Sequence, residues 1–325
     1  MKKDAAHVQT DKEIFRLNKL ASAEYKRAAE DLRKPLLRFL KKHEKHRQRL
    51  LEELLTKKIT KAEMRRRRLE DLMDEDFLLL LDDDADRMSK ATGYLWKKII
   101  ESIPGIYAEN YNWGLWRAET LTGKSLGELL TAEIVRQMWK KNPDMIRMPG
   151  KSHFVATSKK AGALERFWQR QLLNTAISMT ADLPFPIEEI ARQIIEWIWR
   201  QNFSHGRDYV TTTATGVENK GRTDAGKKAK DELMRGWVAI MDERTRIAHR
   251  ILDGTYVGME EPWVYKGDKV WFPGDPSAPA YLVRNCRCTV DFRLKSEIDG
   301  SVHKNERFMG QSYEEWKAGK PIRVK

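Results

Sequence analysis

The chain of 325 residues has very little cysteine, only Cys286 and Cys288. So few cysteines exclude a small secreted scaffold held together by several disulfides. Long hydrophobic runs are also missing. The longest, residues 77–81, is far shorter than the roughly 20 apolar residues that a membrane-spanning helix needs, and acidic residues flank it on both sides. Since no apolar segment follows the basic N-terminus, we expect no signal peptide and a soluble protein made inside the cell.

What the sequence does contain is enough apolar material for a folded core. Hydrophobic residues make up 41% of the chain and there are 11 tryptophans, which excludes a wholly disordered protein. The length allows two or three domains. Lysine and arginine number 61 against 48 aspartates and glutamates, a net charge of +13. Such an excess is typical of proteins with polyanionic partners, although a lysine-rich solvated surface explains it equally well.

The first 90 residues have the pattern of a long helical hairpin. Apolar residues recur at spacings of three and four, the mark of one helix face. Pro35 lies inside this pattern and should kink or restart the helix. A turn is expected near residues 56–60, where Thr60 and Glu63 have the spacing of a capping box.

Charge in this segment is polarised. Residues 31–68 carry 15 bases and 5 acids, a local net charge of +10, whereas residues 70–86 carry nine acids and no base. The basic block ends in a run of four arginines: Arg65, Arg66, Arg67 and Arg68. The run is either a solvated or self-paired helix face, or a contact for nucleic acid or for the acidic surface of a partner protein.

Residues 91–225 are predicted to form a helical middle domain. Turn signals lie near Gly93, Pro104-Gly105, Gly123, Asn142-Pro143 and Pro149-Gly150. Its tryptophans stand at helical spacing among leucines and isoleucines, which favours a role in the core over base stacking. A helix should begin at Pro186 and run to about residue 203, followed by a polar loop over 211–226.

The last hundred residues change character. We predict a helix from about Ala225 to Leu252, then a β-hairpin over 264–272 whose tight turn lies at Gly267-Asp268. A strand should follow at 288–292, and residues 293–325 form a basic tail for which no fold is predicted. The fold class is therefore mainly α-helical, with a small C-terminal α+β module over residues 226–292.

This module carries an unusual set of residues. They are Trp237, Asp242, Arg244, Thr245, Arg246, His249, Asp253, Gly254, Pro273, Gly274, Asp275, Asn285, Cys286 and Cys288. On the predicted helix, Asp242, Arg246 and His249 would share one face. One interpretation of the set is structural, with these side chains cross-linking the helix to the loop and strand that follow.

Two other interpretations involve chemistry. In an extended strand the two cysteines point to the same side, and with His249 they offer three ligands for a metal such as zinc, although no fourth ligand is evident. Alternatively, His249 as a base with Arg244 and Arg246 as phosphate clamps would make a metal- or histidine-dependent nuclease for DNA or RNA. Nucleotide-binding and hydrolase motifs are missing from the sequence.

The order and spacing of these residues closely resemble the MuF-type head morphogenesis domain found in minor head proteins of tailed bacteriophages. The resemblance is clear over residues 230–292, in the segments 237–254, 272–276 and 285–289, and weak back to about residue 160. Residues 1–150 carry no motif that the resemblance explains.

The resemblance implies a minor capsid protein of a phage or prophage, acting with the portal in procapsid assembly and in DNA packaging or delivery. Its implied partners are the portal, capsid and scaffold proteins, packaged double-stranded DNA bound without sequence specificity, and copies of itself. It would lie inside the capsid near the portal, and in the host cytoplasm during assembly. No enzymatic activity and no cofactor are implied, and the 33 residues after Phe292 are too few for the toxin domains of some relatives.

Overall fold

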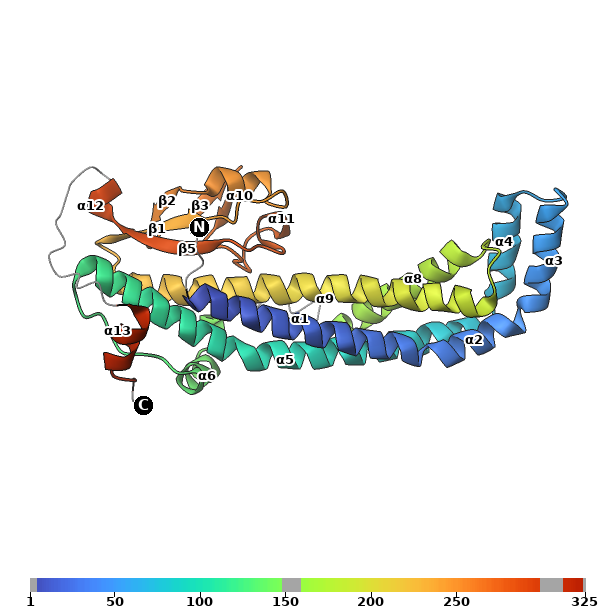
Figure 1. The fold of residues 1–325 in the computed structure, drawn as a ribbon, viewed down its shortest axis with the longest axis horizontal. Coiled ribbons are helices and arrows are strands. Elements are labelled where there is room, and N and C mark those ends of the chain that lie inside the picture. The colour runs from blue at the N-terminus through green and yellow to red at the C-terminus, as the bar shows by residue number, and fades with distance from the viewer. Residues whose placement is uncertain (1–4, 148–158, 299–311, 324–325) are drawn as a thin grey trace. The chain divides into compact units, whose positions relative to one another are not determined.

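The computed structural model describes residues 5–147, 159–298 and 312–323. The chain is mostly helical with a small C-terminal region of antiparallel strands, which confirms the predicted fold class (Figure 1). It divides into two compact units. Unit 1 consists of Met1–Leu17, Lys98–Pro149 and Asp208–Lys325, and unit 2 of Asn18–Lys97 and Gly150–Arg207. The division into four consecutive domains stays a prediction.

Three long helices contribute segments to both units: α1 (Ala5–Asp31), α5 (Glu75–Thr122) and α9 (Ile187–Gly226). Unit 2 adds α2 (Arg33–Lys42), α3 (Glu44–Leu55), α4 (Lys61–Leu72) and α8 (Lys159–Thr180). The restart predicted at Pro35 is confirmed, because α1 ends four residues earlier and Pro35 lies in the first turn of α2. The amide N–H that proline lacks has no partner within a helix at that position.

Helices α3 and α4 form the predicted hairpin, with its turn at residues 56–60 (Figure 1). The Thr60 hydroxyl caps α4 by accepting a hydrogen bond from the Glu63 amide at 3.2 Å. The Glu63 carboxylate accepts from Arg66 and Arg67, each at 2.7 Å, and not from the Thr60 amide as a complete capping box requires.

The basic and acidic blocks pair with each other inside unit 2. The ammonium group of Lys42 lies 2.8 Å from Asp74 and 2.6 Å from Asp76. Arg68 is buried and its guanidinium lies 2.9 Å from Asp71. Much of the local positive charge is therefore neutralised within the unit.

One acid of this block, Asp84 in α5, is fully buried, and neither carboxylate oxygen has a hydrogen-bond partner among the described residues. Burial raises the pKa of Asp84 to about 7, and the neighbouring Asp83 adds to the shift. The pKa of Asp84 in the folded protein lies above its unfolded value of about 4. Protonated Asp84 therefore makes its full contribution to the free energy of unfolding below pH 4. This contribution is lost as the pH rises through 7.

We therefore expect Asp84→Asn to unfold at a higher urea concentration than the wild type at pH 8. Its free energy of unfolding should be higher by at most about 4 kcal/mol. The difference should shrink towards pH 4. Asp83→Asn, which removes the partly exposed neighbour that pairs with Arg87, is the control and should show a much smaller gain, because burial is the main cause of the raised pKa of Asp84. Equal pH profiles for wild type and Asp84→Asn would contradict the assignment.

Unit 1 joins helices to the strands. Besides its parts of α1, α5 and α9 it contains α6 (Ala132–Lys141), η1 (Pro143–Met145), η2 (Lys227–Ala229), α10 (Ile247–Leu252), α11 (Ala280–Val283), α12 (Lys295–Ile298) and α13 (Tyr313–Gly319). The stops predicted at Gly123 and Asn142-Pro143 are confirmed. Those at Gly93 and Pro104 are wrong, because α5 continues through both. Buried Ile103, Ile106 and Tyr107 hold the helix together around the proline. Pro149-Gly150 lies outside the described residues.

The strands of unit 1 form two small antiparallel sheets. They are β1 (Leu233–Val238), β2 (Tyr256–Gly258), β3 (Trp263–Tyr265), β4 (Asp268–Val270) and β5 (Thr289–Leu294). The order in the larger sheet is β2-β1-β5, with Leu233 opposite Leu294 and Val238 opposite Thr289. Strands β3 and β4 form the predicted hairpin, although its two turn residues are Lys266 and Gly267, both with positive φ.

Two local predictions fail in this region. The predicted loop at 211–226 is the last part of helix α9, and the predicted helix at 225–252 is mostly a 3-10 turn, strand β1 and an irregular segment before the short α10. Strand β1 pairs with β2 and β5, and Gly236 leaves room for the Tyr256 ring of β2, whose nearest carbon lies 2.6 Å from where a Cβ would be. Trp237 is then buried in the sheet core.

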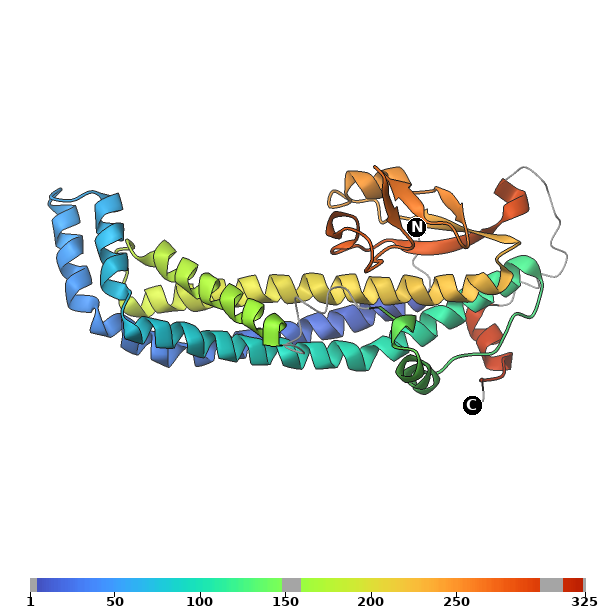
Figure 2. The ribbon, with the colours of Figure 1, turned by 180° about the vertical axis from the view of Figure 1, so that it is seen from behind.

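Part of the predicted tail is also folded. Helix α13 packs on α5 within unit 1 (Figure 2). The Trp316 indole donates to Glu119 at 2.8 Å, and Lys317 contacts Glu109 at 2.7 Å. Leu129 and Ile322 form an isolated β-bridge beside it. None of the described helices has the length and apolar composition to cross a membrane.

Candidate functional site

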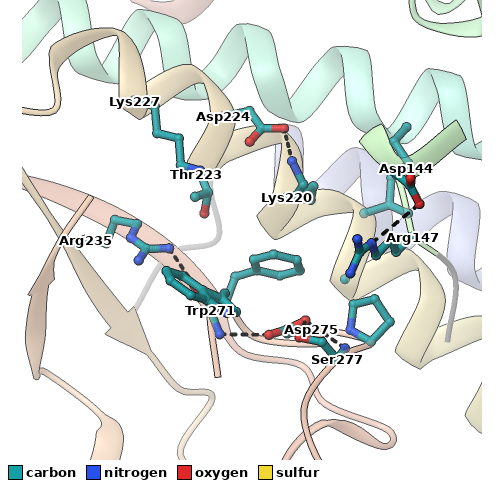
Figure 3. A pocket seen from close by; sticks show the side chains of 15 residues that line it. Asp144, Arg147, Lys220, Thr223, Asp224, Lys227, Arg235, Trp271, Asp275 and Ser277 are labelled. Atoms are coloured by element: carbon teal, nitrogen blue, oxygen red, sulfur yellow. Dashed lines mark hydrogen bonds and ion pairs between the residues drawn. The ribbon is translucent and has the colours of Figure 1, made fainter. Parts of the chain in front are cut away.

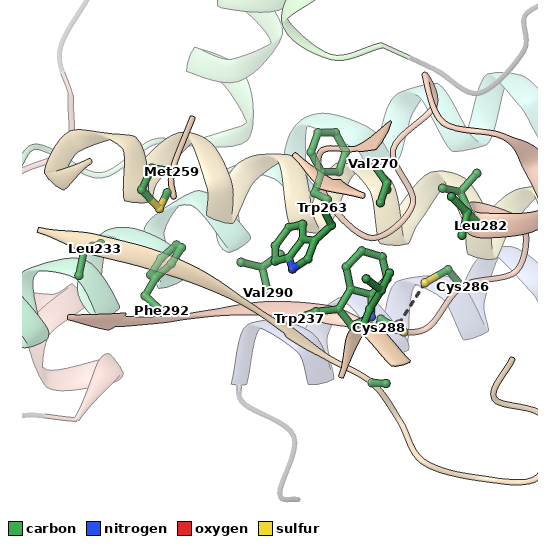
Figure 4. Packing of buried hydrophobic residues seen from close by; sticks show 14 of the residues in the cluster. Leu233, Trp237, Met259, Trp263, Val270, Leu282, Cys286, Cys288, Val290 and Phe292 are labelled. Atoms are coloured by element: carbon green, nitrogen blue, oxygen red, sulfur yellow. Dashed lines mark hydrogen bonds between the residues drawn. The ribbon is translucent and has the colours of Figure 1, made fainter. Parts of the chain in front are cut away.

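The motif residues converge in the C-terminal part of unit 1. Trp237, Trp263, Val290 and Phe292 are buried in one cluster with both cysteines (Figure 4). The Trp237 ring meets the Trp263 ring edge to face, with centroids 5.3 Å apart. Sequence positions as distant as 237 and 292 therefore share one core.

At the edge of this core lies a buried His–Cys–Cys cluster formed by His249, Cys286 and Cys288. His249 Nδ1 is 3.2 Å from Cys288 Sγ and 3.8 Å from Cys286 Sγ. One side-chain ligand atom from each residue lies within 4.8 Å of the others. The structure thus brings together the three residues that the sequence offered as metal ligands.

Hydrogen bonds orient all three side chains. His249 Nε2 lies 2.7 Å from the carbonyl oxygen of Leu282, and the Cys288 amide donates to Cys286 Sγ at 3.4 Å. Hydrogen bonds from the Cys286 thiol and from His249 lower the pKa of Cys288 to about 5, although burial opposes the shift. Burial raises the pKa of Cys286 well above its usual range. The cluster can therefore hold one thiolate close to the histidine ring.

The prediction that Asp242 and Arg246 share a helix face with His249 is wrong, because α10 begins only at Ile247. Asp242 instead organises the preceding turn by accepting from the Arg244 amide at 3.0 Å and from the Thr245 hydroxyl at 3.1 Å. The neighbouring Arg287 guanidinium, 2.8 Å away, holds the pKa of Asp242 well below its usual range.

Arg246 and Arg244 differ in what they contact. The Arg246 guanidinium donates to the carbonyl of Arg284. The Arg244 side chain is mostly exposed, and its guanidinium lies 4.0 Å from Asp242. Arg244 and Arg246 both line a cavity of about 70 Å³ that is also bordered by the His–Cys–Cys cluster.

The remaining motif residues hold loops. The Asp253 carboxylate accepts from the Ala239 amide at 2.7 Å, and Gly254 takes a positive φ of 71°. The buried Asp275 accepts from the amides of Trp271 and Ser277, both at 2.9 Å. These carboxylates accept hydrogen bonds from backbone amides that lie outside the strands and therefore have no partner in a sheet.

The module docks on helix α9 through residues that the sequence placed in a loop. The Thr215 hydroxyl donates to the Cys286 carbonyl at 2.8 Å, and the Thr212 hydroxyl accepts from the Asn285 amide at 2.7 Å. The buried Asn219 side chain donates to the Cys288 carbonyl at 3.0 Å and accepts from the Val290 amide at 2.8 Å. The threonines and glycines that suggested a loop are the small, polar residues that this contact requires.

A buried ionic network continues along α9. Arg222 and Glu218 are fully buried, with their charged groups 3.3 Å apart, and Arg222 donates to Asn110 at 3.0 Å. Glu218 also contacts His7 of α1 at 2.7 Å. Burial lowers the pKa of His7, but the hydrogen bond and charge of Glu218 outweigh it and leave a net increase. Removing one member of such a network leaves a buried charge without its partner.

A second, larger cavity of about 290 Å³ lies between α9, the loop at 271–277 and residues 144–147 (Figure 3). Lys220 and Asp224 pair on its α9 side. The Arg235 guanidinium donates to the carbonyl of Trp271 at its base. Basic and acidic groups are mixed along this cavity, so no single charge defines a ligand for it.

The arginine run in unit 2 is not a uniform basic face. Arg66 contacts Glu63 and Glu70, Arg67 contacts Glu63 and Glu53, and Arg68 is buried. Arg68 is therefore wrongly placed among the predicted contacts for nucleic acid or portal. Arg65 is exposed, as are the three lysines at the hairpin turn, Lys57, Lys58 and Lys61.

The motif residues that resemble the MuF-type domain thus lie together in one α+β module on a helical chain. A comparison with curated proteins finds a similarity to a minor head protein of a phage. The chain is 27% identical over 213 residues to minor head protein GP7 of Bacillus phage SPP1, which covers 62% of the chain and 63% of GP7.

A second match is the NAD(+)–arginine ADP-ribosyltransferase EFV of Enterococcus faecalis, 29% identical over 136 residues. It covers 40% of the chain and 28% of the transferase. The chain thus spans less than two thirds of either relative. No family model and no solved structure matches it.

Proposed function

We propose that the chain acts as a minor head protein in procapsid assembly with the portal, and in the packaging or delivery of DNA. The observation that carries this proposal is the similarity to GP7 over 62% of the chain. The presence of the motif-bearing module in one compact core supports it.

The hairpin tip, defined as Lys57, Lys58, Lys61 and Arg65, is the part of unit 2 best suited to DNA. All four side chains are exposed on the α3–α4 hairpin. Lysine and arginine bind phosphates without reading sequence, because binding releases the counterions that surround DNA. This set replaces the arginine run, in which Arg68 is buried and Arg66 and Arg67 face carboxylates.

Replacing the four tip residues with alanine is expected to weaken DNA binding and to flatten its salt dependence. Each lost phosphate contact should reduce the slope of log K against log salt by about 0.9. Electrophoretic shifts at rising salt measure both effects. The matched control replaces four exposed lysines elsewhere, Lys140, Lys141, Lys228 and Lys269. Equal losses in both variants, or no shift of wild type at low salt, would contradict DNA binding by the tip.

Contact with the portal needs a different surface. In α5, Leu78 and Leu79 are 62% and 67% exposed, while Phe77, Leu80 and Leu81 of the same run are buried. Exposed leucines of this kind favour docking on a protein partner. Full-length protein should co-purify with the portal, and Leu78→Ser with Leu79→Ser should reduce the yield. Leu55→Ser, which alters an 80% exposed leucine at the end of α3, is the control.

We also propose that the chain is not an enzyme. His249 is buried, with Nε2 facing the Leu282 carbonyl and Nδ1 facing the thiols, so the geometry does not favour its use as a general base on nucleic acid. Purified protein should cleave neither DNA nor RNA. Cleavage that is abolished by His249→Ala would overturn this and favour the nuclease.

A further inference from the structure

We infer that His249, Cys286 and Cys288 bind one zinc ion, with the fourth coordination position open to the adjoining cavity. The inference goes beyond the role in head assembly and does not depend on it. It rests on the distances within the cluster, on the orientation of the histidine and on the cavity beside it.

The ligand atoms have the spacing that zinc requires. With Zn–S near 2.3 Å, Zn–N near 2.05 Å and tetrahedral angles, a sulfur and a nitrogen on one zinc lie about 3.5 Å apart. The two measured Nδ1–Sγ distances, 3.2 and 3.8 Å, bracket this value. All three ligand atoms lie within 4.8 Å of one another, so a small rearrangement of the side chains would place them around one ion.

The histidine already has the orientation of a metal ligand. The Leu282 carbonyl can only accept, so Nε2 keeps its proton, and once zinc displaces the proton that Nδ1 shares with the sulfurs, the Nδ1 lone pair of the neutral ring faces the ion. The Cys288 amide, which donates to Cys286 Sγ, offers the hydrogen bond that a metal-bound thiolate accepts. Both groups are the outer partners expected around a zinc site.

The fourth position has no protein ligand among the described residues, since the cluster comprises only these three. The Asp242 carboxylate of the motif is paired with Arg287. The cavity of about 70 Å³ beside the cluster has room for a water molecule, whose share of liquid volume is about 30 Å³. Arg244 and Arg246 line it, so a small anion can replace that water.

The test is metal analysis of the purified full-length protein after loading with zinc and dialysis. We expect one zinc per chain, and a loss of affinity of more than roughly 100-fold in Cys286→Ser, Cys288→Ser and His249→Ala. His46→Ala, which changes a histidine of α3, is the control and should bind as wild type. Wild-type protein without bound zinc would overturn the inference, as would full zinc binding by the doubly substituted Cys286→Ser/Cys288→Ser protein.

Cobalt gives a second readout that needs no variant and so holds even if the substituted proteins fail to fold. Wild-type protein loaded with Co²⁺ should show charge-transfer absorption from cobalt–thiolate bonds, and visible bands of a four-coordinate ion. Added azide should change the visible bands by entering the open position. A spectrum without thiolate absorption would contradict ligation by the cysteines, and a spectrum that azide leaves unchanged would contradict the open position.

Discussion

Gly216→Ala is expected to lower the free energy of unfolding of unit 1 by about 3 kcal/mol, although alanine is the better helix former. A Cβ at position 216 would lie 2.4 Å from the carbonyl oxygen of Gly274 and 3.2 Å from its carbon. Both obstacles are backbone atoms. They cannot move away as a flexible side chain would, because the positive φ of Gly274 and the hydrogen bonds of Asp275 fix this turn.

Gly105→Ala is the matched control. It lies in helix α5 of the same unit, and no described atom beyond its chain neighbours and its own helix backbone comes within 4 Å of where its Cβ would be. This substitution should stabilise unit 1 by roughly 0.5–1 kcal/mol. Urea unfolding followed by circular dichroism shows whether each variant raises or lowers the free energy of unfolding. Hydrogen exchange of peptides from α9 and β5 shows where in the unit the stability changes. Stabilisation by both alanines would show that α9 does not meet the Pro273–Asp275 turn this closely.

Asn219→Ala is the second substitution with a large expected effect, again a loss of about 3 kcal/mol or more in the free energy of unfolding. The Asn219 side chain donates to the carbonyls of Cys288 and Pro273 and accepts from the Val290 amide. All these groups are far from water, so the substitution leaves several buried polar atoms unsatisfied.

Lys220→Ala tests the next position of α9. Lys220 contacts Asp224 at a partly exposed site, and the loss of such a pair should cost less than about 1 kcal/mol. Increased hydrogen exchange in β5 should appear for Asn219→Ala and not for Lys220→Ala. Similar small losses in the free energy of unfolding for both variants would mean that the sheet alone stabilises β5, without a contribution from α9.

The sequence predicts much of this architecture where local signals are strong. Pro35, Thr60 and Gly123 act at the helix ends where their backbone chemistry places them, and Lys266-Gly267 closes the expected hairpin one residue earlier than predicted. The residues that carry the resemblance to the MuF-type domain do belong to one module, and the three metal-ligand candidates meet in it.

What the sequence could not show depends on contacts between distant segments. Residues 211–226 have weak helix propensity, and their sequence predicts a loop. They form the end of α9, and their threonines, Gly216 and Asn219 are the residues through which α9 contacts the module. Strand β1 has the apolar content of a helix and becomes a strand through its pairing with β5. Neither partner can be recognised from local periodicity.

The central claim is that this chain is a component of phage heads, and quantitative mass spectrometry of purified particles tests it most directly. Procapsids and mature heads are prepared from the phage or prophage that encodes the chain. We predict that the protein is present in both, together with the portal and in far fewer copies than the major capsid protein. Its absence from heads that contain the portal and the major capsid protein would contradict the claim.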